Sequence, residues 1–439
     1  MGITSSMPIN KQNFKLMINF ISEQLQNFSK QHGDKPNLNL VIPLSAFNLL
    51  AFLKGQSLAD SPIYPALYWQ NREQQQSIVC LGKIEECDYI PQPTEQACYL
   101  GGLAFQQQGP QWQDFPAVYF IRPALEFKHQ QHTFTLTCHF NGQHSITETL
   151  ALVKQLQKAQ ALTTINNTII TRTDLPNKQQ WAELVNQAIE YKALVPKVVL
   201  SRKTQLVCQE KINHLDLLNQ WQQANPNSFH YSLQFSKKHA YISCSPERLF
   251  SREKDHLQTE ALAGTVHRSR NKQEDDNLLQ SLLTDKKTDR ENYLVQEFII
   301  SNLKALKAQV SCDDTHVMQL HSVQHLWVPI QATLMANTSD AKLLDRLHPT
   351  PAVGGCPKQP ALQFINDNEP YLRGWYAGTV GYLNAQKSDF SVAIRSALIA
   401  DNKIELFAGA GIVTGSVATQ EWQELDNKIR TILEIIEHG

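Results

Sequence analysis

Short apolar segments separated by polar turns dominate the first part of the chain. Segments at 66–69, 77–81 and 132–139 alternate with polar stretches such as the glutamine clusters at 74–76 and 106–108. This alternation is typical of antiparallel strands. We therefore expect the first 140 or so residues to be rich in sheet, with flanking helices.

Helical periodicity is clearest after residue 177. A helix from Asn177 places Trp181, Leu184 and Val185 on one face, and Asn177 with Gln180 has the spacing of a capping box. Two longer helices are predicted over about 289–306 and 419–436, and strands over 197–201, 240–244, 256–261 and within 374–411.

The order of these elements favours the α+β class. Strands and helices are interleaved, but the connections look like hairpins and not like repeated βαβ units, which indicates mostly antiparallel sheets. The length of 439 residues would allow about three domains. No repeat or Pro/Gly/Ser-rich linker divides the chain.

Composition narrows the function classes. With 42% apolar residues, 18% charged residues and a net charge of −1, the chain reads as globular and has no net field to attract nucleic acid or anionic lipid. Its eight cysteines form no C-x-x-C pair, so neither a zinc site nor a disulfide framework is indicated. Without a signal peptide or a long apolar segment, we expect a cytoplasmic protein with no membrane or nucleic-acid partner.

Two predicted helices carry carboxylates beside apolar positions. Glu291 shares a helix face with Leu294 and Val295, where a carboxylate is costly unless it is paired, caps the helix or binds a metal. Glu421, Glu424 and Lys428 fall along one line of the last helix. Taken alone, these residues are better explained as an ordinary Glu–Lys pair on a solvated face.

Other candidate positions lie on strands and turns. Lys197 heads a strand on the face of Val199, and Glu247 ends another. The segments 259–265 and 409–411 look like tight small-residue loops, and the N–H groups of the second could approach an anion. Each feature also has a plain explanation as an edge lysine, a turn glutamate or a tight loop. His321 and His325 have metal-ligand spacing but no third ligand nearby.

A series of motifs in one order resembles the chorismate-utilising enzymes. The motifs, between residues 196 and 428, are PKVVLSR, SPERLF, TEALAGT, REN, HPTPAVGG, GWYAGTVGY, FSVAIRSA, FAGAGIV and EWQELDNK. A weaker likeness to isochorismate synthases, including LYWQNREQQQSIVCLGKIEE at 67–86, extends over most of the chain.

This resemblance implies one large domain over 1–439, because Lys197 and Glu424 must converge on one small substrate. Residues 1–170 would be a divergent N-terminal part that completes the fold, and 171–439 the chorismate-binding catalytic part.

Two positions separate the chemistries within this family. Relatives that use ammonia typically have Gln at the position of Lys197, and some have Lys at the position of Ala263. The chain therefore resembles the water-using isochorismate synthases, menaquinone-type most of all, and needs no glutaminase partner. A salicylate synthase, which also eliminates pyruvate, and a silent partner subunit remain alternatives, as does a siderophore pathway.

The resemblance assigns roles to named residues. Lys197 would take a proton from the water that adds at ring C2 of chorismate, and Glu247 would protonate the departing C4 hydroxyl, so the lysine must be neutral and the glutamate protonated. Glu291 and Glu424 would bind Mg²⁺ at the ring carboxylate, with Glu421 as a ligand or close partner. Some relatives carry another Glu where this chain has Thr288, which leaves fewer charges for the metal.

The resemblance also implies a substrate pocket and a monomer. Arg395 and Tyr376 would hold the enolpyruvyl carboxylate, because a guanidinium can form a bidentate fork. The full set of expected substrate contacts is Leu262, Ala263, Gly264, Thr265, His348, Tyr376, Arg395, Gly411 and Lys428.

Overall fold

The computed structural model describes residues 11–32, 38–95, 97–141, 144–269, 271–319 and 323–438. The strands of this part are β1 (Asn39–Pro43), β2 (Ala66–Gln70), β3 (Gln76–Cys87), β4 (Cys98–Leu103), β5 (Val118–Gln130), β6 (Thr133–His139), β7 (Ile169–Leu175), β8 (Lys197–Cys208), β9 (Phe229–Gln234), β10 (Ala240–Ser245), β11 (Arg248–Glu253), β12 (His256–His267), β13 (Gln309–Cys312), β14 (His316–Gln319), β15 (Val323–Thr333), β16 (Gly355–Cys356), β17 (Thr379–Asn384), β18 (Lys387–Val392), β19 (Ser396–Ala400) and β20 (Lys403–Val413).

The helices lie between and after these strands. They are α1 (Lys11–His32), α2 (Leu49–Ser57), α3 (Ile146–Gln155), α4 (Lys178–Glu190), α5 (His214–Ala224), α6 (Lys272–Thr284), α7 (Lys286–Ala305), α8 (Asp340–Leu347), α9 (Lys358–Asn368) and α10 (Ala418–His438), with a 3-10 turn η1 (Tyr191–Ala193). The predicted cap of α4 is present, since Asn177 and Gln180 form a reciprocal capping box.

The strand pairs of the described residues are all antiparallel, as the α+β prediction requires. One run of pairings leads from β1 through β6, β5, β3, β2, β9, β10, β19, β20 and β8 to β7. A second run leaves β5 through β4, β17, β18, β11 and β12 to β15. Strands from before residue 170 therefore pair directly with strands from the later part of the chain.

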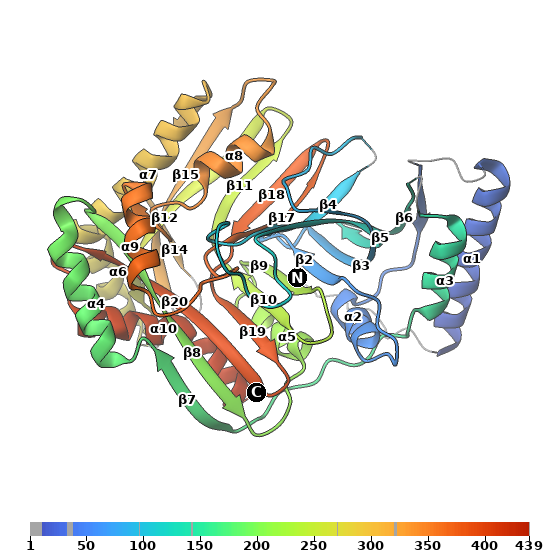
Figure 1. Ribbon diagram of the computed structural model, residues 1–439, viewed down its shortest axis with the longest axis horizontal. Helices are drawn as coiled ribbons and strands as arrows, with labels where there is room; N and C mark the ends of the chain where they lie inside the picture. Colours follow the sequence, from blue (N-terminus) through green and yellow to red (C-terminus); the bar gives the residue numbers. More distant parts are fainter. Residues whose placement is uncertain are drawn as a thin grey trace.

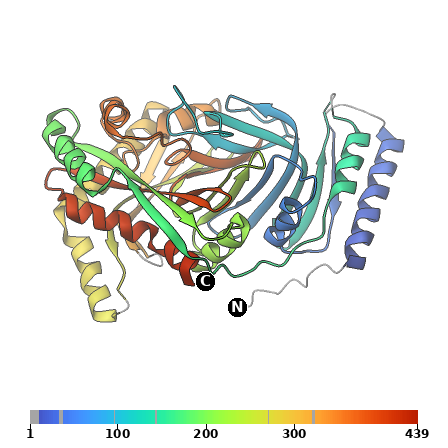
Figure 2. The same ribbon diagram turned by 60° about the horizontal axis from the view of Figure 1, so that its bottom comes forward.

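Helices cover the ends and the underside of these sheets (Figures 1 and 2). α1 and α3 lie side by side at one end, and α4, α6 and α9 lie at the other. α10 packs against β20, and Leu425, Ile429 and Ile436 are buried on one side of this helix. None of the helices among the described residues is long and apolar enough to span a membrane.

Two segments that the sequence pattern suggested as tight loops are strands. Gly409 and Gly411 lie within β20 and pair with Ser201 and Val199 of β8, so the prediction of a turn at 409–411 is wrong. Residues 259–265 lie within β12, where the register against β15 shifts after Ala263. Gly264, with a φ of +82°, provides that bulge, because a left-handed φ favours glycine.

Candidate active site

One cavity brings together most of the residues that the motifs singled out. It opens between β8, β12, β20, α7 and α10, and Val199, Phe407 and Val353 contribute apolar wall. The expected site residues that line it are Glu247, Leu262, Ala263, Gly264, Thr265, Glu291, Tyr376, Arg395, Gly411, Glu424 and Lys428. These residues are far apart in the sequence, so their convergence is produced by the pairing of β8 with β20 and of β12 with β15.

Lys197 lies directly behind the cavity wall. Strand alternation places it on the same face of β8 as Val199, which lines the cavity. Its side chain is fully buried, and its Nζ lies 3.0 Å from Glu291 Oε1. A Cβ on Gly411 would come within 2.4 Å of Glu291 Oε1, so only glycine lets β20 approach the carboxylate of α7 this closely.

Glu247 is a buried carboxyl group in the cavity wall just after β10. Burial raises its pKa to about 8, and the negative charge of Glu260 adds to that shift. The charges of Lys197, Lys428 and Arg395 lower the pKa by less. Glu247 therefore holds a proton at neutral pH, which is the state that a general acid needs.

Two cationic side chains stand on the cavity surface. Lys428 Nζ lies 2.5 Å from Glu424 Oε1 and donates to the carbonyl oxygen of Gly409 at 2.7 Å. Burial lowers the pKa of Arg395 to about 10, so the guanidinium keeps its charge at neutral pH. Arg395 also has a φ of 48°, a left-handed conformation that is costly for a residue with a side chain and that recurs at functional sites.

Tyr376 supplies a hydroxyl group to the same surface. Its ring stacks on Phe407 with centroids 5.2 Å apart, and a Cβ on Gly409 would lie 2.8 Å from its hydroxyl oxygen. Burial raises the pKa of Tyr376, so the phenol remains a hydrogen-bond donor at neutral pH.

Three of the expected site residues do not line the cavity. Lys197 lies outside the lining set, and its Nζ is next to the lining residue Glu291. His348 Nε2 lies 2.9 Å from the carbonyl oxygen of Ala377, and its buried ring is not part of the wall, which differs from the expectation that it lines the ring pocket. Glu421 is buried in α10, also outside the set of lining residues.

His325 also lines the cavity, a position that no pattern in the sequence indicates. Its Nδ1 lies 2.9 Å from the hydroxyl of Thr265, its partner in the β12–β15 register. Burial, together with the charges of Arg395 and Lys428, lowers its pKa well below the ordinary value, so the ring is neutral. Only the pairing of these strands reveals the position. His321, its supposed partner in metal binding, lies outside the described residues.

The buried ion pair of Arg373 and Glu369 supports the wall from behind. Arg373 donates to the carbonyl oxygens of Val199 at 2.7 Å and Val353 at 2.9 Å, while its guanidinium also binds Glu369. Because Val199 and Val353 line the cavity, this guanidinium fixes two sides of the site at once.

The acidic residues of the cavity fit a hard cation. Glu291 from α7 and Glu424 from α10 present carboxylate oxygens to the same space, and these are the ligands that Mg²⁺ prefers. Among the described residues, no three acidic side chains of this cavity converge within one coordination sphere. An ion held by Glu291 and Glu424 would therefore keep positions for water and for a substrate carboxylate.

Comparison with known proteins identifies the family. Residues 87–437 match the family described as chorismate binding enzyme. The chain belongs to this family. The match contains the cavity and the nine motifs that lie between residues 196 and 428.

Curated members of the family are similar over nearly the whole chain. The isochorismate synthase MenF of Haemophilus influenzae is 34% identical over 403 residues, which covers 90% of each chain. The enzyme of the same name from Escherichia coli is 34% identical over 434 residues and covers 94% of this chain and 97% of its own.

Solved structures agree with this relation. The menaquinone-specific isochorismate synthase MenF from Escherichia coli matches with a TM-score of 0.82 at 31% identity, covering 95% of this chain and 99% of that one. Anthranilate synthase component I from Streptococcus pneumoniae, at 18% identity and a TM-score of 0.62, shares the fold. The structure is thus one large antiparallel domain of the type found in this family.

Proposed function

We propose that this chain is an isochorismate synthase, which converts chorismate to isochorismate and serves menaquinone synthesis. The observation that carries the proposal is the buried, protonated Glu247 in the wall of a cavity that also holds Arg395 and Lys428, cations for a dianionic substrate. The Nζ of Lys197 lies next to this cavity, 3.0 Å from Glu291 Oε1. The similarity to enzymes named isochorismate synthase supports the same reaction.

The reaction adds water at C2 of the ring while the hydroxyl at C4 leaves. Lys197 Nζ accepts a proton from the attacking water, and the carboxyl of Glu247 gives its proton to the departing oxygen. One proton is taken up and one is released, so the step is balanced.

The carboxylates of chorismate require cationic partners. Arg395 and the hydroxyl of Tyr376 would bind the enolpyruvyl carboxylate, with Lys428 nearby. Glu291 of α7 and Glu424 of α10 would hold Mg²⁺. Glu421 lies one turn before Glu424 on α10. When bound, the ion supplies positive charge for the ring carboxylate. His348 would act by supporting the backbone at Ala377 and not by touching the ring.

Incubation of the purified chain with chorismate and Mg²⁺, followed by chromatography of the products, tests this function. We expect isochorismate to accumulate toward an equilibrium mixture with chorismate. Release of pyruvate with fluorescent salicylate would instead identify a salicylate synthase. Absence of both products from folded protein with Mg²⁺ would show that the chain does not catalyse the proposed reaction.

We also propose that the chain acts as a monomer in the cytoplasm without a glutaminase partner. Lys197 stands where the ammonia-using relatives carry Gln, and all eight cysteines are free thiols, in keeping with a reducing compartment. Light scattering after size-exclusion chromatography tests the oligomeric state. Turnover with water alone, unchanged by added ammonium, tests the independence from ammonia.

A further inference from the structure

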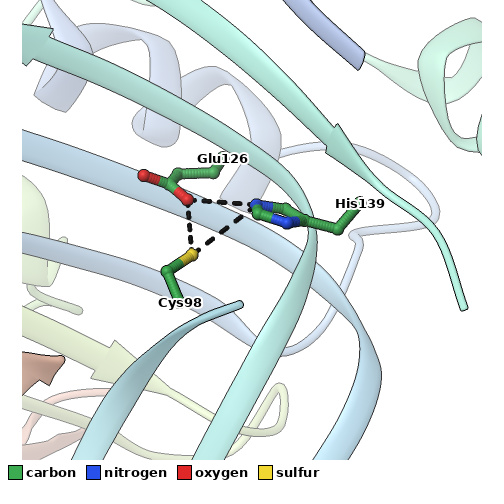
Figure 3. A group of neighbouring side chains, drawn as sticks. All are labelled: Cys98, Glu126 and His139. Atoms are coloured by element: carbon green, nitrogen blue, oxygen red, sulfur yellow. Dashed lines mark hydrogen bonds and ion pairs between the residues drawn. The ribbon is translucent and has the colours of Figure 1, made fainter. Parts of the chain in front are cut away.

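Three buried side chains from adjacent strands meet at a single point in the N-terminal part (Figure 3). Cys98 begins β4, Glu126 lies within β5, and His139 ends β6. Their exposed fractions are 6%, 3% and 2%. The sulfur of Cys98 lies 2.6 Å from Glu126 Oε2 and 3.6 Å from His139 Nε2, and the last two atoms are 3.1 Å apart. None of the three residues lines the active-site cavity.

The geometry of this cluster does not suit a catalytic thiol. Both Cys98 and Glu126 approach the same ring nitrogen of His139, whereas a relay would place the carboxylate on the other one. Within the described residues, His139 Nδ1 has no hydrogen-bond partner. Burial raises the pKa of the Cys98 thiol well above its ordinary value, which makes it a poor nucleophile.

The convergence of sulfur, nitrogen and oxygen on one point is the arrangement of a metal site. We propose that Cys98, Glu126 and His139 bind a zinc ion that ties β4, β5 and β6 together. Thiolate, imidazole and carboxylate are the ligands that zinc takes in proteins, whereas Mg²⁺ prefers oxygen alone. This site would be separate from the proposed magnesium site and independent of the proposed reaction.

The distances and the charges agree with zinc. With bonds of about 2.3 Å to sulfur and about 2.0 Å to nitrogen, tetrahedral donors stand roughly 3.3 to 3.6 Å apart. The Cys98–His139 and His139–Glu126 distances of 3.6 and 3.1 Å are close to this range. The Cys98–Glu126 distance of 2.6 Å is shorter, so zinc binding requires these two side chains to move apart. Cys98 loses its proton on binding, so a thiolate and a carboxylate neutralise the two positive charges of the ion. A neutral buried site avoids the cost of an unpaired charge.

Cys80 is the strand partner of Glu126 in the β3–β5 register, but its sulfur does not belong to the group of converging ligand atoms. Three protein ligands with a water molecule would complete the coordination.

Reconstitution with metal tests the proposal. The full, untagged chain is stripped with a chelator under reducing conditions, loaded with Zn²⁺ or Co²⁺, and freed of excess metal. We expect one equivalent of zinc per chain by mass spectrometry, a thiolate-to-cobalt charge-transfer band, and a rise in Tm that depends on zinc concentration. Folded wild-type chain that holds less than about a tenth of an equivalent, or shows no charge-transfer band, would overturn the proposal.

A matched variant separates metal binding from simple packing. Cys138→Ser removes a buried thiol next to His139 in the sequence. Cys138 belongs to a different hydrophobic cluster from Cys98, so this variant should keep the zinc and the cobalt band. Cys98→Ser should lose both, and its Tm should no longer respond to zinc. Equal zinc retention by folded Cys98→Ser would contradict the site. If Cys98→Ser does not fold, His139→Asn is measured in the same way.

Discussion

In the proposed reaction, Lys197 takes the proton from the attacking water. Replacing it with Met keeps most of the side-chain volume but removes the amine, so we expect Lys197→Met to lower kcat by about 10²- to 10⁴-fold. Lys203 lies on the same strand and pairs with Glu405 at 3.2 Å outside the cavity. Lys203→Met should therefore retain turnover. Folded Lys197→Met with near wild-type kcat would exclude the role of base.

Glu247 gives the reaction a predicted pH dependence. Its carboxyl must be protonated to act as an acid, and burial raises its pKa to about 8. We expect kcat/KM to fall tenfold per pH unit above about 8, because the free enzyme then loses this proton. Glu247→Gln should lower kcat by about 10²- to 10⁴-fold and remove this limb from whatever activity remains. A profile that stays flat from pH 7 to 10 would disagree with the assignment.

The carboxyl group of Glu247 also makes the free energy of unfolding depend on pH. The folded-state pKa of Glu247 lies above that of an exposed Glu, so the native chain binds the proton more tightly than the unfolded chain. This contribution is complete below about pH 4 and is lost as the pH rises through about 8. Relative to Glu247→Gln, the wild-type free energy of unfolding should fall by up to about 1.4 kcal/mol per pH unit across that window. Urea melts from pH 5 to 9 measure it, with the exposed Glu434→Gln as a control that shows no such slope.

At the scale of elements, α7 and α10 bring two carboxylates to the cavity from different parts of the chain. If Glu291 and Glu424 hold Mg²⁺, then Glu291→Gln or Glu424→Gln should raise the Mg²⁺ concentration for half-maximal activity by at least about tenfold, because a charged oxygen ligand is replaced by a neutral one. Glu434→Gln, on an exposed part of α10, should leave it unchanged. Unaltered Mg²⁺ dependence in both cavity variants would place the metal elsewhere.

The close approach of β20 to α7 predicts a specific effect of a single methyl group. In Gly411→Ala the new Cβ would lie 2.4 Å from Glu291 Oε1 and 3.4 Å from Lys197 Cε, so the carboxylate must move. We expect a loss of activity of at least about tenfold and weaker dependence on Mg²⁺, with little change in Tm. Gly109→Ala meets no atom within 4 Å of its Cβ, although its φ of +85° disfavours alanine, so it should lower Tm slightly and leave activity intact. Full activity of Gly411→Ala would show that this contact is unimportant.

The same elements show how far sequence reasoning extends. Local signals predicted the α4 cap and several strands, among them β2, β8 and β10, because caps and periodicity depend on neighbouring residues. The glycines of 409–411 were misinterpreted as a turn, since their small size serves contacts with Glu291 and Tyr376 across strands. His325 was missed for the same reason, because its place depends on the pairing of β12 with β15. The family motifs supplied most of the cavity residues, which local patterns alone could not connect.

At the scale of the whole molecule, the net charge is close to zero, but the charged side chains are not evenly distributed. The chain carries a net charge of −1, yet Arg395, Lys428 and buried Lys197 gather around one cavity. The cluster of Cys98, Glu126 and His139 is a second local feature that composition and spacing could not indicate, because its members meet only when three strands pair. Total charge and cysteine spacing exclude classes of protein but do not locate sites.

Strand pairing across residue 170 predicts that the catalytic part does not fold alone. β2 pairs with β9, and β4 pairs with β17, so a chain of residues 171–439 would expose two strand edges. It would also divide a buried cluster in which Trp69 and Leu100 pack with Tyr231 and Trp375. We expect this fragment to show no cooperative thermal transition and no turnover of chorismate.

A chain that lacks only the first 37 residues is the control for this fragment. A chain that starts at residue 38 lacks α1, which packs mainly against α3 and β1 at one end of the molecule, away from the cavity (Figure 2). It should keep its turnover with a lower Tm, because buried Ile21 and Leu25 are lost from that end. Calorimetry measures the thermal transition of both truncated chains, and the product assay measures their turnover of chorismate. Cooperative melting with activity in residues 171–439 would mean that the first 170 residues are a separate unit, whereas the pairing of β2 with β9 and of β4 with β17 makes them part of the same sheet that supports the active site.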